Sequence, residues 1–243
     1  MADPSTGAGL DAVVFDWGGT LTPWHTVDFA AEAQALALAA LDPHPEAHLD
    51  LQVANQTVWA RSKDSQRSAT LADVFTEAGL RHDESLLTAY REFWDPHTHT
   101  DPGVVELFEK LRSDGLRIGV LSNTVWPRGW HEDIFRRDGV LDLLDGAVYT
   151  SEVPWTKPSP EAFRAAAKAV GVDDPARCVF VGDRLFDDIW GAAQVGMRTI
   201  FVPHSAIPPE QIGHSLGEPD AVVHRLADVA DVVRRWRSAP EGK

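Results

Sequence analysis

Short apolar runs rich in valine, isoleucine and phenylalanine recur along the chain, and amphipathic, helix-like stretches separate the later ones. This alternation predicts a parallel sheet covered by helices. The predicted strands are Ala12–Phe15, Ile118–Leu121, Ala147–Tyr149, Val179–Val181 and Thr199–Val202, with a last short strand near Ala221–Val223. The predicted helices between and after them are Val104–Arg112, Trp130–Arg137, Pro160–Val170, Asp187–Val195 and Leu226–Trp236.

The strand spacing breaks once, between the first and second predicted strands. The intervening segment has no convincing strand but four helical patterns, at Asp28–Leu41, Pro45–Arg61, Thr70–Ala78 and Glu84–Phe93. Turn-forming residues stand at both junctions, Thr22-Pro23 on entry and Asp101-Pro102-Gly103 on exit. We therefore predict a three-layer α/β core of residues 1–21 and 102–243 with an all-helical insertion of residues 22–101.

Composition and net charge exclude some classes of binding partner and indicate where in the cell the protein is expected. The 243 residues carry a formal net charge of −15 and show no strong basic patch, so neither nucleic acid nor an anionic membrane surface is expected as a partner. No apolar stretch reaches the roughly 18 residues of a membrane span, and Met1–Leu10 lacks the pattern of a signal peptide, which predicts a cytoplasmic protein. The single cysteine, Cys178, excludes an internal disulfide and is predicted to be a small buried hydrophobe.

Polar residues suited to phosphate and metal binding follow the predicted strands. They are Asp16 after the first, Ser122 and Asn123 after the second, Lys157 after the third, and Asp183, Asp187 and Asp188 after the fourth. Ligands of open α/β sheets bind beyond the carboxyl ends of the strands, so these side chains are expected to converge. A lysine and a hydroxyl bind phosphate oxygens, carboxylates hold a hard cation such as Mg²⁺, and a metal-oriented carboxylate can attack phosphorus.

Four segments in this order resemble the motifs of the haloacid dehalogenase superfamily. They are Val13-Val14-Phe15-Asp16-Trp17-Gly18-Gly19-Thr20-Leu21, then Ser122-Asn123, then Lys157-Pro158-Ser159-Pro160, and finally Gly182-Asp183 with Asp188 before Ile189-Trp190-Gly191-Ala192. The helical insertion also resembles the cap that this family carries between its first and second motifs. The resemblance implies a Rossmann-like core and a small phosphorylated substrate, hydrolysed through a phosphoaspartyl intermediate on Asp16.

The resemblance also implies roles for individual residues. The implied catalytic residues are Asp16, Ser122 and Lys157. The predicted substrate-binding residues are Thr20, Ser122, Asn123, Lys157 and Arg128, of which Thr20 would position the Asp16 loop and Arg128 has surface charge as its alternative. The implied Mg²⁺ ligands are Asp16, the backbone carbonyl of Gly18, Asp183 and Asp188, with Asp187 as the alternative to Asp188.

Gly18 departs from the phosphatase pattern, because phosphatases of the family usually carry there the Asp that acts as general acid and base. A phosphatase would then take its proton from water, from the substrate or from a cap residue such as His25, His97 or His99. Three alternatives remain: a haloacid dehalogenase, a catalytically weak protein that binds a phosphorylated ligand or regulates a partner, and a phosphonoacetaldehyde hydrolase. The last would form a Schiff base through Lys63, the only lysine of the cap.

The tryptophans near the motifs have two interpretations. Six tryptophans lie near motif loops or junctions, and they predict either an aromatic mouth for a planar leaving group or a seal between cap and core. They are Trp17, Trp24, Trp94, Trp126, Trp130 and Trp155. Arg184, directly after Asp183, is interpreted as a surface ion pair.

Overall fold

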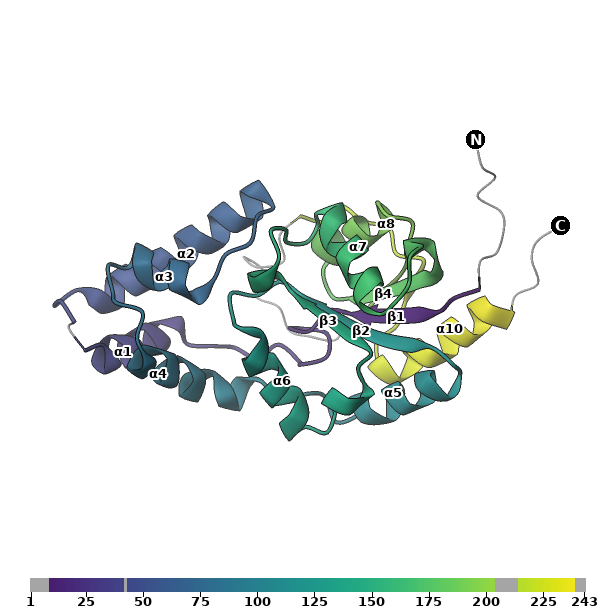
Figure 1. Cartoon of the computed structure of the whole chain (residues 1–243), viewed down its shortest axis with the longest axis horizontal. Coiled ribbons are helices and arrows are strands. Elements are labelled where there is room, and N and C mark those ends of the chain that lie inside the picture. The colour runs from purple at the N-terminus through teal and green to yellow at the C-terminus, as the bar shows by residue number, and fades with distance from the viewer. Residues whose placement is uncertain (1–8, 42, 204–213, 239–243) are drawn as a thin grey trace.

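The computed structural model describes residues 9–41, 43–203 and 214–238 (Figure 1). Its centre is one six-stranded sheet of parallel strands in the order β3-β2-β1-β4-β5-β6. The strands are β1 (Ala12–Phe15), β2 (Arg117–Ser122), β3 (Gly146–Tyr149), β4 (Cys178–Gly182), β5 (Arg198–Phe201) and β6 (Ala221–Val222). The predicted parallel α/β sheet is confirmed.

Strand β1 occupies the middle of the sheet because its whole sequence is apolar and can be buried on both faces. All four of its residues are buried, as expected for a central parallel strand. Phe15, its last residue, pairs with Val120 of β2 on one side and with Val181 of β4 on the other. Asp16 therefore begins the loop at the centre of the carboxyl edge, where open α/β sheets bind ligands.

Helices cover both faces of the sheet, which gives the predicted three layers (Figure 1). One face carries α5 (Val104–Ser113), α6 (Arg128–Arg137) and α10 (Val229–Ser238), and the other carries α7 (Pro160–Ala169) and the short α8 (Gly191–Ala193). Alternate residues of β1 enter the two cores: Phe15 packs with the first set of helices and Val14 with the second. Cys178 is a free, buried thiol, as predicted.

The chain between β1 and α5 forms a helical cap that extends beyond the carboxyl edge of the sheet (Figure 1). Its helices are α1 (Phe29–Ala39), α2 (Ala47–Ser65), α3 (Leu71–Glu77) and α4 (Glu84–Trp94). Polar caps start three of them, because free amides at a helix N-terminus need acceptors. Asp28 accepts from two amides of α1, Asp83 does the same for α4, and Thr70 forms a capping box with Asp73.

The loop between α2 and α3 packs directly on the core loop that precedes Lys157. The amide of Ser68 donates to the Pro154 carbonyl and that of Thr156 donates to the Gln66 carbonyl, each at 3.3 Å. The guanidinium of Arg67 lies 4.6 Å from the centre of the Trp155 ring, and the two residues form an isolated antiparallel bridge. The cap thus contacts the core through this loop as well as through its two linkers.

The prediction of one regular α-helix over Asp187–Val195 is wrong. It begins with a π-helical turn at Leu185–Trp190 and continues as the short α8. The carbonyl of Arg184 accepts from the amides of both Asp188 and Ile189, at 3.1 and 3.2 Å, and so widens the turn. Helix α6 also begins two residues before the predicted Trp130, at Arg128.

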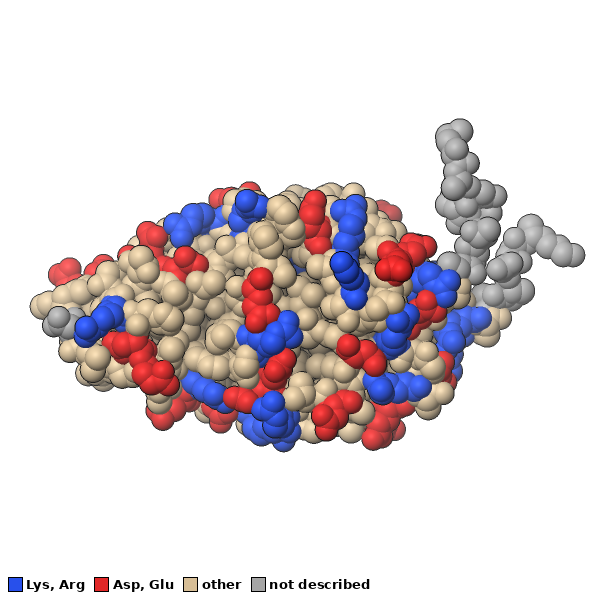
Figure 2. Space-filling model, in the orientation of Figure 1, with Lys and Arg blue, Asp and Glu red and all other residues tan. Residues whose placement is uncertain are grey.

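Charged side chains of both signs are interspersed over the face shown in Figure 2. Within the part of the chain that the structure describes, no helix combines the length and the apolar character needed to cross a membrane.

Candidate active site

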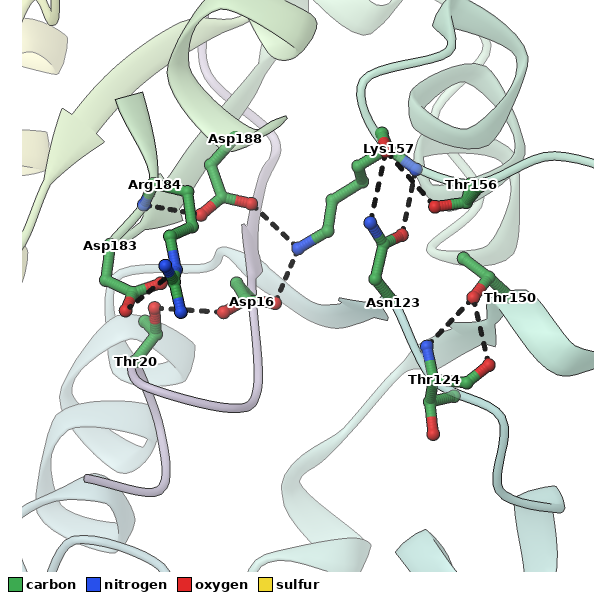
Figure 3. A network of polar contacts seen from close by, with 10 residues as sticks. All are labelled: Asp16, Thr20, Asn123, Thr124, Thr150, Thr156, Lys157, Asp183, Arg184 and Asp188. Atoms are coloured by element: carbon green, nitrogen blue, oxygen red, sulfur yellow. Dashed lines mark hydrogen bonds and ion pairs between the residues drawn. The ribbon is translucent and has the colours of Figure 1, made fainter. Parts of the chain in front are cut away.

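Asp16 is buried at the end of β1 and holds two hydrogen bonds (Figure 3). Its Oδ1 accepts from Lys157 Nζ at 2.5 Å, and its Oδ2 accepts from Thr20 Oγ1 at 3.2 Å. Burial raises the pKa of Asp16 to about 6. The positive charge of Lys157 opposes this rise, and the negative charge of Asp188 adds to it. The carboxylate is therefore oriented by its neighbours and is ionised at neutral pH.

Lys157 joins two carboxylates of the site. Its Nζ also donates to Asp188 Oδ1 at 2.7 Å, and the lysine side chain is 3% exposed. Burial alone would lower the pKa of Lys157, but the negative charges of Asp16 and Asp188 have the larger effect and raise it. The ammonium therefore stays charged. Asn123 holds the lysine backbone through both ends of its amide: Nδ2 donates to the Lys157 carbonyl at 3.1 Å, and Oδ1 accepts from the Lys157 amide at 2.8 Å.

Asp183 completes an acidic cluster with Asp16 and Asp188. One carboxylate oxygen of each residue lies within 4.8 Å of the others, and all three residues are buried. Both oxygens of Asp183 are buried without a hydrogen bond from the described residues. Burial, with repulsion from Asp16 and Asp188, raises the pKa of Asp183 well above its usual range. Such clustered, unsatisfied carboxylates fit a hard divalent cation such as Mg²⁺.

The two glycines after Trp17 have different packing. Gly19 has a φ of +93°, and a Cβ at this position would overlap the carboxylate of Asp183. A Cβ built on Gly18 meets no atom within 4 Å. Close packing therefore demands glycine at position 19, whereas the absence of a side chain at position 18 is not imposed by space.

The structure brings most of the sequence-predicted residues to one edge of the sheet. Asp16, Thr20, Asn123, Lys157, Asp183 and Asp188 lie within the network of Figure 3. Ser122, also buried, ends β2 beside Tyr149 of β3. Asp188 and not Asp187 belongs to the cluster, because the π-helical turn directs it inward, where its Oδ2 accepts from the amide of Arg184 at 2.9 Å.

Arg128 has partners of its own on the core. Its Nε donates to Glu152 at 2.9 Å, its Nη1 approaches Glu132 at 3.4 Å, and its guanidinium lies 4.9 Å from the centre of the Tyr149 ring. These contacts are those of a partly exposed ion-pair network. A contact of Arg128 with substrate stays a prediction.

Arg184 forms an ion pair, as predicted, but the predicted surface position is wrong. Its side chain is 17% exposed, with Nε 3.7 Å from Asp183 Oδ2. Its guanidinium lies 5.9 Å from the ring centre of Trp24, in the linker between β1 and α1. The signal that points to this placement is its position next to Asp183 in the fourth motif.

Four of the six tryptophans form one continuous cluster between cap and core. The Trp126 ring lies 5.4 Å from both Trp17 and Trp94 and 6.1 Å from Trp130. These contacts match the predicted seal. A cavity of about 130 Å³ opens at its edge, lined in part by Trp94, Trp126 and Trp130. Trp24 and Trp155 instead pack against arginines.

Glu32 is a buried carboxyl that the sequence reasoning missed. It lies in the first turn of α1 and accepts from Trp94 Nε1 at 2.7 Å. Burial raises its pKa to about 7, against the hydrogen bonds of Trp94 and Tyr90. An acidic residue in a first helical turn is ordinarily a solvated one, so nothing local distinguishes this position. By contrast, the cap histidines His25 and His99 are exposed, and His97 packs on Phe93 and Trp94.

The sheet, the inserted cap and the strand-end carboxylates define a Rossmann-like α/β protein with a helical cap and an acidic site at the carboxyl edge of the sheet. Residues 10–196 match the family model of the haloacid dehalogenase-like hydrolases, and the chain belongs to this family. The family resemblance predicted from the four motifs is confirmed.

Curated relatives of several activities align over much of the chain. It is 26% identical to the glyceraldehyde 3-phosphate phosphatase of Methanopyrus kandleri, over 93% of this chain and 97% of that protein. It is 30% identical to the N-acetylmuramic acid 6-phosphate phosphatase of Pseudomonas aeruginosa, over 93% and 96%. It is 27% identical to the phosphonoacetaldehyde hydrolase of Bordetella pertussis, over 72% and 66%.

Solved structures share the fold. A HAD phosphatase from Thermococcus onnurineus superposes with a TM-score of 0.63 at 22% identity, covering 92% of this chain and 98% of that one. A 2-haloacid dehalogenase from Pseudomonas syringae pv. tomato superposes with a TM-score of 0.64 at 24% identity, covering 93% and 99%.

Proposed function

We propose that this protein is a Mg²⁺-dependent phosphatase of small phosphate monoesters that works through a phosphoaspartyl intermediate on Asp16. One observation carries the proposal: the ammonium of Lys157 bridges Asp16 and Asp188 beside Asp183, whose buried oxygens accept no hydrogen bond from the described residues. This combination pairs a cation for phosphate oxygens with ligands for a metal. Relatives that align over nearly the whole chain and are named as phosphatases support it.

The proposed metal ligands are Asp16, Asp183, Asp188 and the backbone carbonyl of Gly18. When bound, Mg²⁺ would neutralise the negative charge that repels an anionic phosphate from the carboxylates. The chain supplies the remaining positive charge through Lys157, which is held in place by Asn123. Positive groups fixed in a buried site are effective because they need no reorganisation during the reaction.

Asp16 is the proposed nucleophile. One of its carboxylate oxygens attacks phosphorus, the bond from phosphorus to the ester oxygen breaks, and the leaving oxygen takes its proton from water to depart as the alcohol. Lys157, Ser122 and Asn123 would hold the transferred phosphoryl oxygens, while Thr20 keeps Asp16 oriented. Water then attacks the phosphorus of the acyl phosphate, which releases inorganic phosphate and restores Asp16.

Gly18 shapes the range of substrates. It offers no side chain to protonate the leaving oxygen, a contribution of typically about 10²–10⁴ in rate. Substrates with acidic leaving groups, such as aryl phosphate esters and acyl phosphates, depend least on that proton. We therefore propose that they react faster than alkyl phosphates. The cap, for which we propose residues 22–101, would choose among substrates.

A panel of aryl, acyl and alkyl phosphates, assayed with and without Mg²⁺, tests the proposal. The expected result is hydrolysis that needs the metal and is lost in Asp16→Asn, a substitution that keeps the size of the side chain. Thermal unfolding with Mg²⁺ gives the matched binding control, with stabilisation expected for the wild type and lost in Asp183→Asn. A panel that stays inert although Mg²⁺ binds would reject the phosphatase and leave dehalogenation or non-catalytic phospholigand binding.

One observation favours phosphonoacetaldehyde hydrolysis as the second candidate. A relative named as a phosphonoacetaldehyde hydrolase aligns over 72% of this chain at 27% identity, and Lys63 is the cap lysine that would form the Schiff base. Borohydride trapping of phosphonoacetaldehyde on the wild type but not on Lys63→Ala would establish this function in place of the first.

A further inference from the structure

The first two helices of the cap expose large apolar side chains. Seven large hydrophobic residues are exposed in the part of the chain that the structure describes, and five of them lie between residues 38 and 59. These five are Leu38 (87% exposed), Leu41 (65%), Leu49 (49%), Val53 (61%) and Trp59 (39%). Single exposed apolar residues are ordinary on a protein surface, but their concentration on two neighbouring helices indicates an interaction surface.

Helices α1 and α2 pack against each other, and their inner sides already have partners within the cap. Glu32 of α1 is hydrogen-bonded to Trp94 of α4, and Leu51 and Val58 of α2 are buried. Helix α1 ends and α2 begins at the end of the cap that lies farthest from the sheet (Figure 1). None of the described elements of this chain covers the exposed sides of the two helices, which are therefore open to another molecule.

Each of these helices has one exposed row of uncharged residues, with alternating spacings of three and four residues. The row of α2 and the row of α1, which continues one step beyond the helix end, are Leu49, Val53, Gln56 and Ala60, and Ala31, Gln34, Leu38 and Leu41. This is the spacing of the seam along which one helix packs on another. The rows therefore suit a helical partner.

The two rows lack charge although the chain is strongly acidic. Residues 51–60 of α2 include no charged residue, and the only charged residue of α1 is Glu32, which is buried inside the cap. Two copies of a chain with a net charge of −15 repel each other unless they meet where charges are absent. A two-fold axis brings identical surfaces together, so a charged surface would set like charges opposite each other. A neutral helical face thus favours a second copy as its partner.

We propose that the exposed face of α1 and α2 binds the same face of a second copy of this chain and forms a two-fold symmetric dimer. An axis that crosses α2 between Val53 and Gln56 makes the two copies of this helix antiparallel. It also sets the bulky Leu49 of one copy opposite the small Ala60 of the other, and such pairing of large with small side chains allows close packing. The interface lies outside the catalytic edge, and the inference does not depend on the proposed function.

Sedimentation velocity of the full chain over a dilution series measures the dissociation constant of the dimer. Val53→Glu and Val53→Lys each place like charges on both sides of the axis, whereas an equimolar mixture of the two variants places opposite charges there. Leu216→Glu, at an exposed leucine outside the cap, is the matched control. Circular dichroism and thermal unfolding confirm that each variant is folded, as expected for substitutions at exposed positions.

The wild type is expected to sediment as a dimer at micromolar concentrations. Val53→Glu and Val53→Lys should each weaken the dimer by at least about tenfold, and their mixture should recover it. Leu216→Glu should dimerise as the wild type does. A wild type that is monomeric at every concentration, or a dimer that Val53→Glu leaves unchanged, would overturn the inference. A monomer that binds lipid vesicles only when Val53 is intact would assign the face to a membrane surface and overturn it as well.

Discussion

Glu32 of α1 accepts a hydrogen bond of 2.7 Å from Trp94 Nε1 at the end of α4. The two residues stand at opposite ends of the cap sequence, and the Trp94 ring continues into the core through Trp126. A carboxyl group is thereby enclosed in the aromatic contact between cap and core.

Glu32 should make the fold less stable as the pH rises. Its pKa is about 7 in the folded protein against 4.5 for a free side chain, so the folded state holds the proton more tightly. Stability is then full below pH 4.5 and falls as the pH rises to about 7. The loss of stability due to Glu32 should approach roughly 3 kcal/mol. Glu32→Gln should remove this part of the pH dependence and leave the part due to the buried carboxyls of the active site. Urea unfolding at pH 5 and pH 8 measures both slopes.

Glu109→Gln, on the exposed side of α5, is the control for that experiment. It should show the same change of stability with pH as the wild type. Equal slopes for Glu32→Gln and the wild type would show that Glu32 is not the group responsible.

The pH profile of kcat/KM should fall on its acid side near pH 6, because Asp16 must be a carboxylate to attack phosphorus and its pKa is about 6. More Mg²⁺ should move this limb to lower pH, since a bound cation favours the ionised form. Profiles at two Mg²⁺ concentrations check the prediction. A limb that does not respond to Mg²⁺ would assign it to a group outside the metal cluster.

Gly18→Asp should speed hydrolysis of alkyl phosphates more than that of aryl phosphates. The structure has room for the new side chain, because a Cβ at this position meets nothing within 4 Å. The added carboxyl would protonate the leaving oxygen, which alkyl esters need most. Initial rates on matched ethyl and aryl esters measure the ratio, and a uniform loss on both would show that the site is organised in another way.

Gly19→Ala should weaken Mg²⁺ binding, whereas Gly18→Ala should leave the fold at its normal stability. The Gly19 backbone has a φ of +93°, and its Cβ would collide with Asp183, one of the proposed metal ligands. The shift of the thermal midpoint with added Mg²⁺ reports both variants. A normal shift in Gly19→Ala would argue against Asp183 as a ligand.

Lys157→Met should destabilise the protein by roughly 3–5 kcal/mol near pH 8, because it leaves buried carboxylates without their cation. Added Mg²⁺ should recover part of that loss, and the loss should be smaller near pH 5, where the carboxyls take up protons. Chemical unfolding with and without Mg²⁺ checks this. Lys168→Met, on the exposed side of α7, should cost little.

The sequence alone determined the class of fold, the inserted helices and most of the candidate site. These features are local: apolar runs such as Ala12–Phe15 mark buried strands, and a residue that directly follows a parallel strand necessarily lies at the carboxyl edge. For this reason Asp16, Ser122 and Asp183 could be located before any contact was known. The motif spacing in the chain then connected them to one family.

Only the tertiary structure decided which polar side chains are buried and what they contact. The Arg184 carbonyl accepts two amide hydrogen bonds, and the resulting wide turn brings Asp188 into the cluster. Arg184 is largely buried because Asp183 and Trp24 flank it, and Glu32 is buried where α4 packs against α1. Burial of this kind depends on segments distant in sequence, and a local pattern of hydrophobic and polar positions does not encode which of them will meet.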